Sequence, residues 1–303
     1  MEELKDSNLD EVVEIDAGEV EENGLPNDSE LDNPIIETET ESNLIKDYFS
    51  KQGGTPIKEI ANIFGQSEDE ISKEFSNFKA KKLYSKLDYL LDDTSLTICD
   101  FKSQLLLAYK NGFKSVTVYP TFVLLAKDTL KNSGVKVRAL ISYPYGEDYA
   151  KTKNLSIKNA IKNGADELII AISVSAVKSG NFKNIVKEIK KALKYSKKRS
   201  VSVLFELSKL TSPEVEKCAK AIINEAKIYS VVPSFLYSNT TYNVEIIKDL
   251  LTAVNGKCYV DVISDIDTAT DTVSVLSQGA NSLTSKGCVK IVNDLNNKII
   301  SNV

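Results

Sequence analysis

From residue 87 to the end of the chain, short runs rich in β-branched residues alternate with amphipathic segments of helical period. This alternation predicts βα units and a parallel sheet. Eight runs qualify as strands: 87–91, 115–120, 136–144, 167–173, 201–206, 229–234, 258–264 and 281–285. Eight such units predict an α/β fold, a (β/α)8 TIM barrel over 87–303, with its active face at the carboxyl ends of the strands.

Composition excludes several kinds of chemistry. The chain contains no histidine, which rules out histidine metal sites and Ser-His or Cys-His nucleophile pairs. Its four cysteines are scattered without CxxC spacing, which suits a reducing cytosol. No membrane-length apolar run or secretory signal is present, so we expect a cytoplasmic protein that does not enter a membrane. No GxGxxG, Walker loop or acidic metal cluster occurs, and we expect no cofactor and no metal.

Charge divides the chain into two parts. Residues 1–42 hold 16 Asp and Glu against one Lys, whereas residues 43–303 hold 27 acidic and 37 basic residues. Because residues 1–42 are this acidic and have little apolar surface to bury, they are predicted to form a disordered tail. A sharper hypothesis is that this tail competes for a basic surface of its own protein.

Residues 43–86 have a helical pattern and predict a small helical module. The spacing of Ala61, Gly65 and Ile71 resembles a helix-turn-helix, in which Gly permits the tight turn. The second helix opens with three acids at 68–70, which have the wrong sign for phosphates. A protein-docking or capping role is therefore favoured over DNA binding, which stays an alternative.

Several motifs resemble the deoxyribose-phosphate aldolase family. LDYLLDDTSLTICDF and KNGFKSVTVYPTFVLLAKDTLKNSGVKVRALISYPYG are similar to that family's opening, which reads approximately IDHTLLKPDAT, then GF-SV-V-P-YV and SGVKV-FP-G. GADELIIAISVSAVKSGNF is similar to its GADEID stretch and the following KSG. The resemblance runs in register over 87–290. It implies a TIM-barrel lyase whose barrel lysine forms an imine, assisted by a second lysine and an aspartate.

At the positions that the resemblance assigns to this chemistry, the residues differ. The family's aspartate falls on Ile169, and its imine lysine falls on Val231 or Val232, depending on one gap. Its second lysine falls on Asp261. An imine needs a nucleophilic amine, so the resemblance predicts the fold without predicting the activity.

The phosphate site differs as well. The family's phosphate-binding Gly-Gly corresponds to Ser264-Asp265, beside Asp261. Two negative charges about 5 Å apart repel by roughly 3 kcal/mol at an effective dielectric constant near 20, which is about a hundredfold in affinity. Lys286 stands in LTSKG, where the family has a GTSSG-like phosphate loop, and is a candidate anion ligand. An imine role for Lys286 or for Lys209, after the fifth strand, is not favoured over that of a solvated loop lysine.

Other side chains are expected at the barrel mouth. Glu206 ends the fifth strand, and Tyr119, Tyr143, Tyr145 and Tyr237 fall near strand ends. The tyrosines are candidates for an aromatic pocket that takes a neutral ligand, although packing is the commoner role. A mouth filled by Tyr and Leu favours a scaffold, whereas an open, charged cavity favours a binding protein or enzyme.

Three functions follow. The leading one is an aldolase-like barrel without Schiff-base activity that acts as a binding, regulatory or assembly protein. It would take a small-molecule or anionic ligand at the mouth, or a protein partner through 43–86, and oligomerisation is left open. The alternative is a divergent lyase of a sugar phosphate that uses Glu206, Asp261 and Asp265 for acid/base work around a divalent ion. The third is a DNA-binding regulator that senses a ligand through the barrel.

Overall fold

The computed structural model describes residues 83–237, 244–253 and 258–301. The chain divides into two compact units, Met1–Thr55 and Pro56–Val303. The predicted acidic tail (1–42) and all but the last four residues of the predicted helical module (43–86) lie outside the described residues. The predictions for those segments stay predictions.

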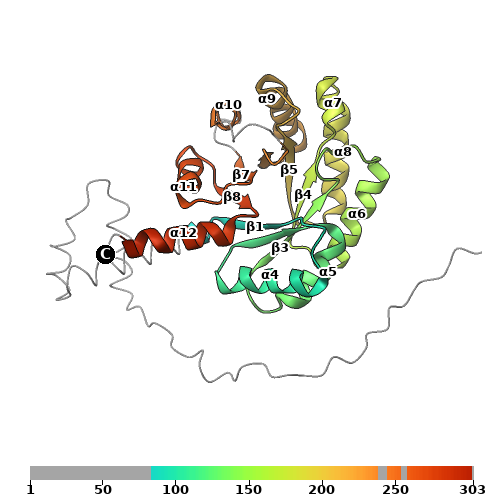
Figure 1. The fold of residues 1–303 in the computed structure, drawn as a ribbon. Coiled ribbons are helices and arrows are strands. Elements are labelled where there is room, and N and C mark those ends of the chain that lie inside the picture. The colour runs from blue at the N-terminus through green and yellow to red at the C-terminus, as the bar shows by residue number, and fades with distance from the viewer. Residues whose placement is uncertain (1–82, 238–243, 254–257, 302–303) are drawn as a thin grey trace, which may run out of the picture. The chain divides into compact units, whose positions relative to one another are not determined.

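Eight parallel strands pair in chain order and close into a barrel, with β8 pairing back to β1 (Figure 1). The strands are β1 (Leu87–Leu91), β2 (Ser115–Val118), β3 (Lys136–Ile141), β4 (Glu167–Ala171), β5 (Ser200–Glu206), β6 (Ser230–Ser234), β7 (Tyr259–Ser264) and β8 (Ser282–Ser285). Each coincides with a predicted run, which confirms the (β/α)8 barrel. Strands β2 and β3 end earlier than predicted, because Pro120 and Pro144 cannot donate to the sheet and Ser142 has a left-handed φ of 60°.

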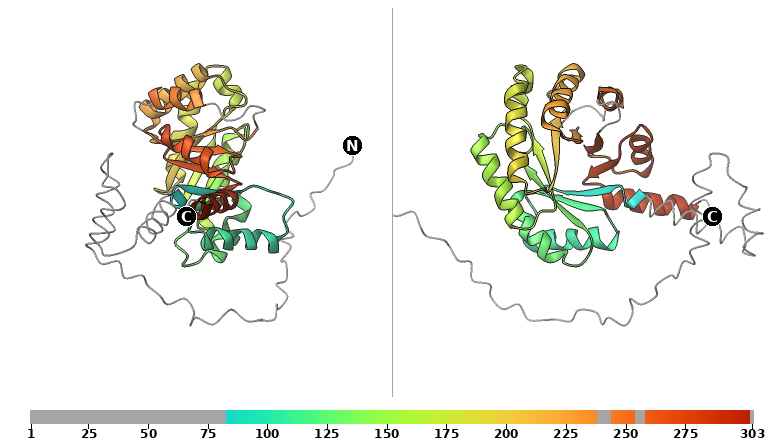
Figure 2. Two further views of the ribbon diagram at one scale, coloured as in Figure 1. Left: turned by 60° about the vertical axis from the view of Figure 1, so that its left-hand side comes forward. Right: turned by 180° about the vertical axis from the view of Figure 1, so that it is seen from behind.

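Helices surround the strands in all three ribbon views (Figures 1 and 2). The α-helices are α4 (Ile98–Lys110), α5 (Val123–Thr129), α6 (Ala150–Lys162), α7 (Val174–Lys178), α8 (Phe182–Tyr195), α9 (Ser212–Ala221), α10 (Val244–Ala253), α11 (Ala269–Ser277) and α12 (Cys288–Ser301). Two single turns accompany them, the 3-10 turn η2 (Pro120–Phe122) and the π turn η3 (Ile222–Ala226).

Local side chains determine where several helices begin. The Thr97 hydroxyl accepts a hydrogen bond from the N–H of Asp100 at the start of α4. At the start of α9, Thr211 and Glu214 form a reciprocal capping box. Such caps satisfy N–H groups that have no partner inside the helix, and each contributes about 1 kcal/mol.

The strands carry two separate apolar clusters. The larger one lies between the strands and the helices, and a smaller one lies inside the barrel. All four cysteines are free, and only Cys99 is exposed. Among the described residues, no helix is long and apolar enough to cross a membrane.

Gly146, between β3 and α6, is required for a close backbone contact with the end of β4. Its φ is +68°, and a Cβ there would lie 2.2 Å from the carbonyl carbon of Ile172. Gly180 has a similar φ of +64° but no atom within 4 Å of such a Cβ. We therefore expect Gly180→Ala to cost about 1 kcal/mol and Gly146→Ala about 3 kcal/mol or more, because β4 must shift. Urea unfolding of both variants checks this, and equal losses would contradict the close contact.

Candidate site in the barrel interior

An aliphatic layer crosses the middle of the barrel. Seven side chains form it, each at most 1% exposed: Leu90, Leu140, Ile169, Ala171, Leu204, Val232 and Ile263. They come from strands β1, β3, β4, β5, β6 and β7. Successive strand residues face opposite sides of the sheet, and these positions share the side that faces the barrel axis.

Val231 and Val232, the two positions on which the resemblance places the imine lysine, face opposite sides of the sheet. Val232 belongs to the aliphatic layer, whereas Val231 packs in the outer cluster against the helices. A side chain at 232 is therefore the one that could reach the barrel interior. Ile169 also belongs to the aliphatic layer. Positions 169 and 232, which face inward among those that the resemblance links to imine chemistry, therefore carry hydrocarbon side chains.

Beneath the aliphatic layer lies a group of three buried charges, Asp88, Arg138 and Asp261, which we call the charged floor. Each precedes a residue of the aliphatic layer by two positions on its strand, so it faces inward one layer nearer the strands' amino ends. Arg138 Nη2 lies 2.6 Å from Asp261 Oδ2, and Arg138 Nη1 lies 3.3 Å from Asp88 Oδ2. The guanidinium therefore bridges two carboxylates across the barrel.

Hydroxyl groups complete the charged floor. Thr284 Oγ1 accepts from Arg138 Nη1 at 3.0 Å and donates to Asp261 Oδ2 at 2.8 Å. Ser282 donates to Asp261 Oδ1 at 2.8 Å. Asp261 has no exposed surface, so these bonds and the ion pair replace its hydration.

The electrostatics of the charged floor depend on burial and on charge pairing. Burial raises the pKa of Asp88, and the neighbouring Asp261 raises it further, against the opposing effect of Arg138. For Arg138, burial acts to lower the pKa, but the charges of Asp261 and Asp88 outweigh it and the pKa is raised. Arg138 therefore stays cationic and holds the two carboxylates together.

This placement corrects the prediction that Glu206, Asp261 and Asp265 converge at the mouth. Asp261 lies below the aliphatic layer, where it is bound to Arg138, and Glu206 lies above that layer at the end of β5. Asp265 is exposed in the loop after β7. Among the described residues, no group of three Asp, Glu, Cys or His side chains could hold a metal ion. Asp261 is therefore in no position to repel or bind a ligand at the mouth.

Glu206 is the buried acid of the mouth. It is 1% exposed, and its Oε2 accepts a hydrogen bond from the Ser234 hydroxyl at 2.7 Å. Its Oε1 accepts from the backbone N–H of Ser208 at 3.2 Å. Both carboxylate oxygens therefore have partners on β6 and in the loop after β5.

The four tyrosines predicted at strand ends do come together. Ring centroids lie 6.2 Å apart for Tyr119 and Tyr143, and 5.9 Å apart for both Tyr143–Tyr237 and Tyr145–Tyr237. Tyr143 and Leu236 pack directly on the aliphatic layer. Burial raises the pKa of Tyr143, so its phenol stays neutral. Tyr and Leu side chains thus cover part of the mouth.

Neither Lys286 nor Lys209, the two lysines expected near the mouth, is a buried amine. Lys286 forms an ion pair with Asp92, with Nζ 2.8 Å from Oδ1, and its side chain is 51% exposed. Lys209 is exposed. Among the described residues, Lys153 is the one buried lysine, and its Nζ bonds Glu188 at 2.6 Å.

The loops after β7 and β8, where the resemblance placed the phosphate site, pack tightly against each other. Ser285 donates to the carbonyl oxygen of Ile266 at 2.5 Å, and the N–H of Gly287 donates to Ser285 Oγ at 2.9 Å. A Cβ at Gly287 would lie 2.5 Å from the Cβ of Asp267. Ser264 is buried and accepts from the N–H of Ile266 at 3.4 Å. The Gly287 N–H, which could otherwise bind a phosphate, is therefore already used.

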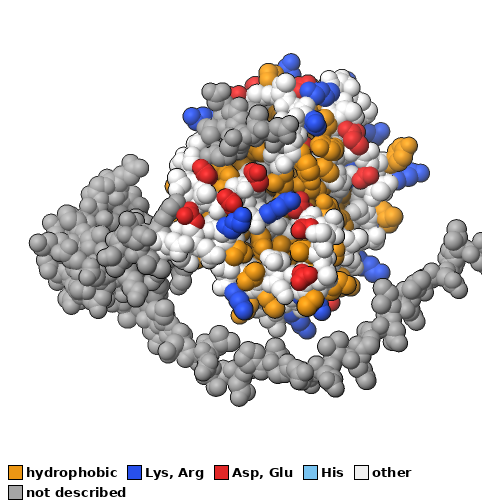
Figure 3. Space-filling view, viewed as in Figure 1, with side chains coloured by type: hydrophobic (Ala, Val, Ile, Leu, Met, Phe, Trp, Pro, Cys, Tyr) orange, Lys and Arg blue, Asp and Glu red, His pale blue; other side chains and the backbone are white. Residues whose placement is uncertain are grey.

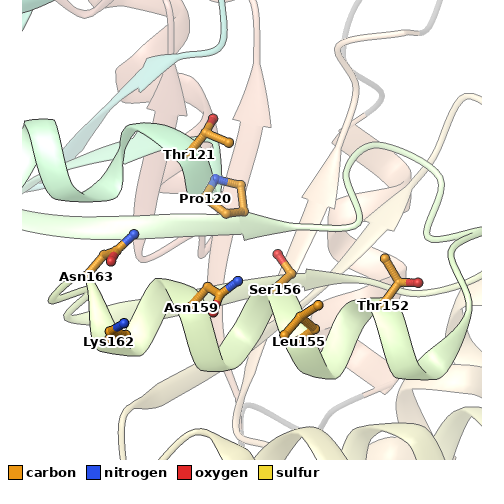
Figure 4. Close-up of a pocket in the computed structure, with 8 residues that line it drawn as sticks. All are labelled: Pro120, Thr121, Thr152, Leu155, Ser156, Asn159, Lys162 and Asn163. Atoms are coloured by element: carbon orange, nitrogen blue, oxygen red, sulfur yellow. The ribbon is translucent and has the colours of Figure 1, made fainter. Parts of the chain in front are cut away.

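A hollow of about 400 Å³ lies outside the barrel, between η2 and α6 (Figure 4). Most of its lining residues are polar by type, but the surface that they expose to it is mostly apolar: Pro120, Thr121, Thr152, Leu155, Ser156, Asn159, Lys162 and Asn163. Along α6 these side chains follow one face, opposite Pro120 and Thr121. None of the predicted site residues lines it, so this hollow is separate from the barrel interior.

Two residues of the charged floor, Asp88 and Arg138, were not predicted. A signal was present, because each is a charged residue two positions before a strand leucine that faces inward. A charge with that spacing must be buried, and a buried charge needs a partner. Which partner it takes does not follow from the spacing.

Comparison with known proteins agrees with this architecture. Residues 88–231 match the family model described as DeoC/LacD family aldolase. The deoxyribose-phosphate aldolase of Acholeplasma laidlawii is 30% identical over 211 residues, which cover 68% of this chain and 95% of that protein. The enzyme of the same name from Staphylococcus carnosus is 32% identical over 183 residues, 60% of this chain and 83% of that protein.

A solved structure shows the same fold. The deoxyribose phosphate aldolase of Aeropyrum pernix superposes with a TM-score of 0.64 at 19% identity, covering 72% of this chain and 92% of that one. Fold and sequence together define an aldolase-type TIM barrel. The chain belongs to the DeoC/LacD aldolase family.

Proposed function

We propose that this family member has no Schiff-base aldolase activity and acts as a binding, regulatory or assembly protein. The observation that carries this proposal is Val232 in the aliphatic layer, which is the inward-facing one of the two positions, 231 and 232, on which the resemblance places the imine lysine. Valine has no group that can attack an aldehyde, and covalent catalysis of this kind requires an amine.

The charged floor supports the same proposal. The second lysine of the resemblance is replaced by Asp261, whose charge is balanced by Arg138 from β3. A guanidinium keeps its proton at any ordinary pH and cannot serve as the neutral nucleophile. Arg138 therefore restores positive charge to the interior without restoring the chemistry of an amine.

A binding role also agrees with the surface. Ile98, Leu124 and Leu155 are each more than half exposed, on α4, α5 and α6. Figure 3 shows apolar side chains gathered in a band near the middle of one face, between acidic and basic groups. Exposed apolar surface of this kind is typical of protein contacts.

The rival functions have less support. A carboxylate-based lyase would need its acids together, but Glu206 and Asp261 lie on opposite sides of the aliphatic layer. The DNA-binding regulator depends on the predicted helix-turn-helix, which lies outside the described residues.

Borohydride trapping tests the proposal. The purified chain is incubated with deoxyribose 5-phosphate or acetaldehyde and then reduced with borohydride. Its mass is measured by mass spectrometry, with the Acholeplasma laidlawii enzyme as positive control. We expect no covalent adduct on this chain under conditions that fully label the control. A reduced adduct mapped to any lysine, including Lys153, Lys209 or Lys286, would overturn the proposal.

A further inference from the structure

The positive charge of residues 43–303 is concentrated in one region. Residues 150–199 contain 13 Lys and Arg against three Asp and Glu. This excess equals the entire excess of positive charge in residues 43–303. The region includes α6 and α8, which pack against each other and lie side by side in Figures 1 and 2.

Helix α8 exposes only its charged side. Its apolar residues Ile185, Val186, Ile189 and Ala192 are buried against the barrel. Five lysines of α8 are exposed, and Lys197, Lys198 and Arg199 are exposed directly after it. We call these eight cations, together with the three exposed lysines of α6, the basic face. Because the apolar side of α8 is already used, a partner meets mainly charge on this helix, which opposes its insertion into a lipid surface.

The cations of α8 and of the following turn are not balanced within the described part of the chain. No carboxylate of the described residues forms an ion pair with any of the eight. The one acid of α8, Glu188, is bound to the buried Lys153 at 2.6 Å. Lys187, Lys190, Lys191 and Lys194 are like-charge neighbours three or four positions apart, which opposes helix formation.

The turn after α8 carries further cations at a conformational cost. Lys197 and Lys198 have φ values of 49° and 70°, a left-handed backbone that glycine or asparagine adopts more easily. Lysine at both positions adds two exposed charges where smaller residues would relieve strain. Lys197 and Lys198 therefore keep positive charge in this turn at a cost in stability. Backbone strain of this kind is typical of a binding surface.

We propose that the basic face binds the phosphate backbone of nucleic acid without reading its bases. Ten of its eleven cations are lysines, which are flexible point charges suited to phosphate, whereas the rigid fork that favours bidentate recognition belongs to Arg. The 14 residues of α8 span about 20 Å. Duplex DNA presents roughly twelve phosphates over that length. This activity uses the outer surface and goes beyond the function proposed for the barrel interior.

The test uses the full chain and a fluorescein-labelled 20-base-pair duplex, followed by anisotropy from 20 to 200 mM salt. We expect log K to fall linearly with log salt, with a slope of about −4 or steeper, as about five phosphate contacts require. The triple variant Lys187→Glu, Lys190→Glu, Lys194→Glu should bind at least tenfold more weakly at 20 mM salt, with a shallower slope.

The matched control carries the same change of charge elsewhere. Lys102→Glu, Lys110→Glu, Lys131→Glu alters three exposed lysines on and after α4 and α5, and should bind within twofold of the unaltered chain. Thermal unfolding checks that both triple variants are folded. Absence of binding at 20 mM salt, or equal weakening by both triple variants, would overturn the proposal. So would equal or tighter binding of a labelled 20-residue poly-glutamate, which would assign the face to acidic peptides.

Discussion

Replacing Arg138 by leucine is expected to lower the free energy of unfolding by about 3–5 kcal/mol, because it leaves Asp88 and Asp261 buried without their shared cation. Both carboxylates have 0% exposed surface, so water cannot replace the lost partner. Urea or thermal unfolding measures the loss. We expect this loss of stability to be among the largest caused by any single substitution in the barrel.

Two controls show whether charge causes this loss. The chain has only two arginines, and Arg199 is exposed in the turn after α8. Arg199→Leu should change the stability by no more than about 0.5 kcal/mol. The triple variant Arg138→Leu, Asp88→Asn, Asp261→Asn removes all three charges and should be more stable than Arg138→Leu alone. If the triple variant is less stable than the single one, the guanidinium is not there to balance the carboxylates.

Replacing Val232 by lysine is the second large effect. It places an ammonium group in the aliphatic layer, where Val232 has no exposed surface. A fully buried lysine loses about 3–5 pKa units, so at pH 7 we expect a loss of about 4 kcal/mol or more. Val232→Met is the matched control for size without charge, and overpacking should cost it about 1–3 kcal/mol.

The pH dependence of Val232→Lys has a definite sign. Burial lowers the pKa of lysine in the folded state below its unfolded value of about 10.4. Between those two values the unfolded chain binds more protons, so stability rises with pH. The difference in free energy of unfolding between Val232→Lys and Val232→Met should shrink as the pH approaches 10. If the two variants lose the same stability at every pH, position 232 is in contact with water, and the interior is not a dry aliphatic layer.

The fold could be predicted almost completely from the sequence, because β-branched runs and amphipathic segments alternate without interruption after residue 87. The ends of β2 and β3 were placed too late. The prolines at 120 and 144 carried that information, since each removes an N–H that a sheet needs.

The site was predicted only in part, for two physical reasons. A single gap decides whether the family's imine lysine falls on 231 or 232. Which of the two faces inward is fixed by the paired strands, because side chains alternate sides along a strand. The partner of Asp261 is 123 residues away on β3. The position of a charged residue within one strand can show that its side chain is buried. Which residue it pairs with across the barrel depends on how the whole sheet closes.

The paired strands of this barrel accommodate an interior made of hydrocarbon side chains and a buried group of charges. The inner positions at 169 and 232 are filled by side chains that pack with their neighbours, so the aliphatic layer contributes hydrophobic burial across six strands. In the charged floor beneath it, one guanidinium bridges Asp88 and Asp261, and Lys114 also pairs with Asp88 at 3.5 Å. The strands pair into the same closed barrel with this interior, and they carry the family's architecture.

Turnover tests most directly whether the barrel interior lacks an amine able to attack an aldehyde. Cleavage of deoxyribose 5-phosphate is followed by the release of its aldehyde products, at matched concentrations of this chain and the Acholeplasma laidlawii enzyme. We expect the chain to give no more product than buffer alone while the control consumes its substrate. Product formation that disappears on substituting one of the chain's own lysines would contradict the account.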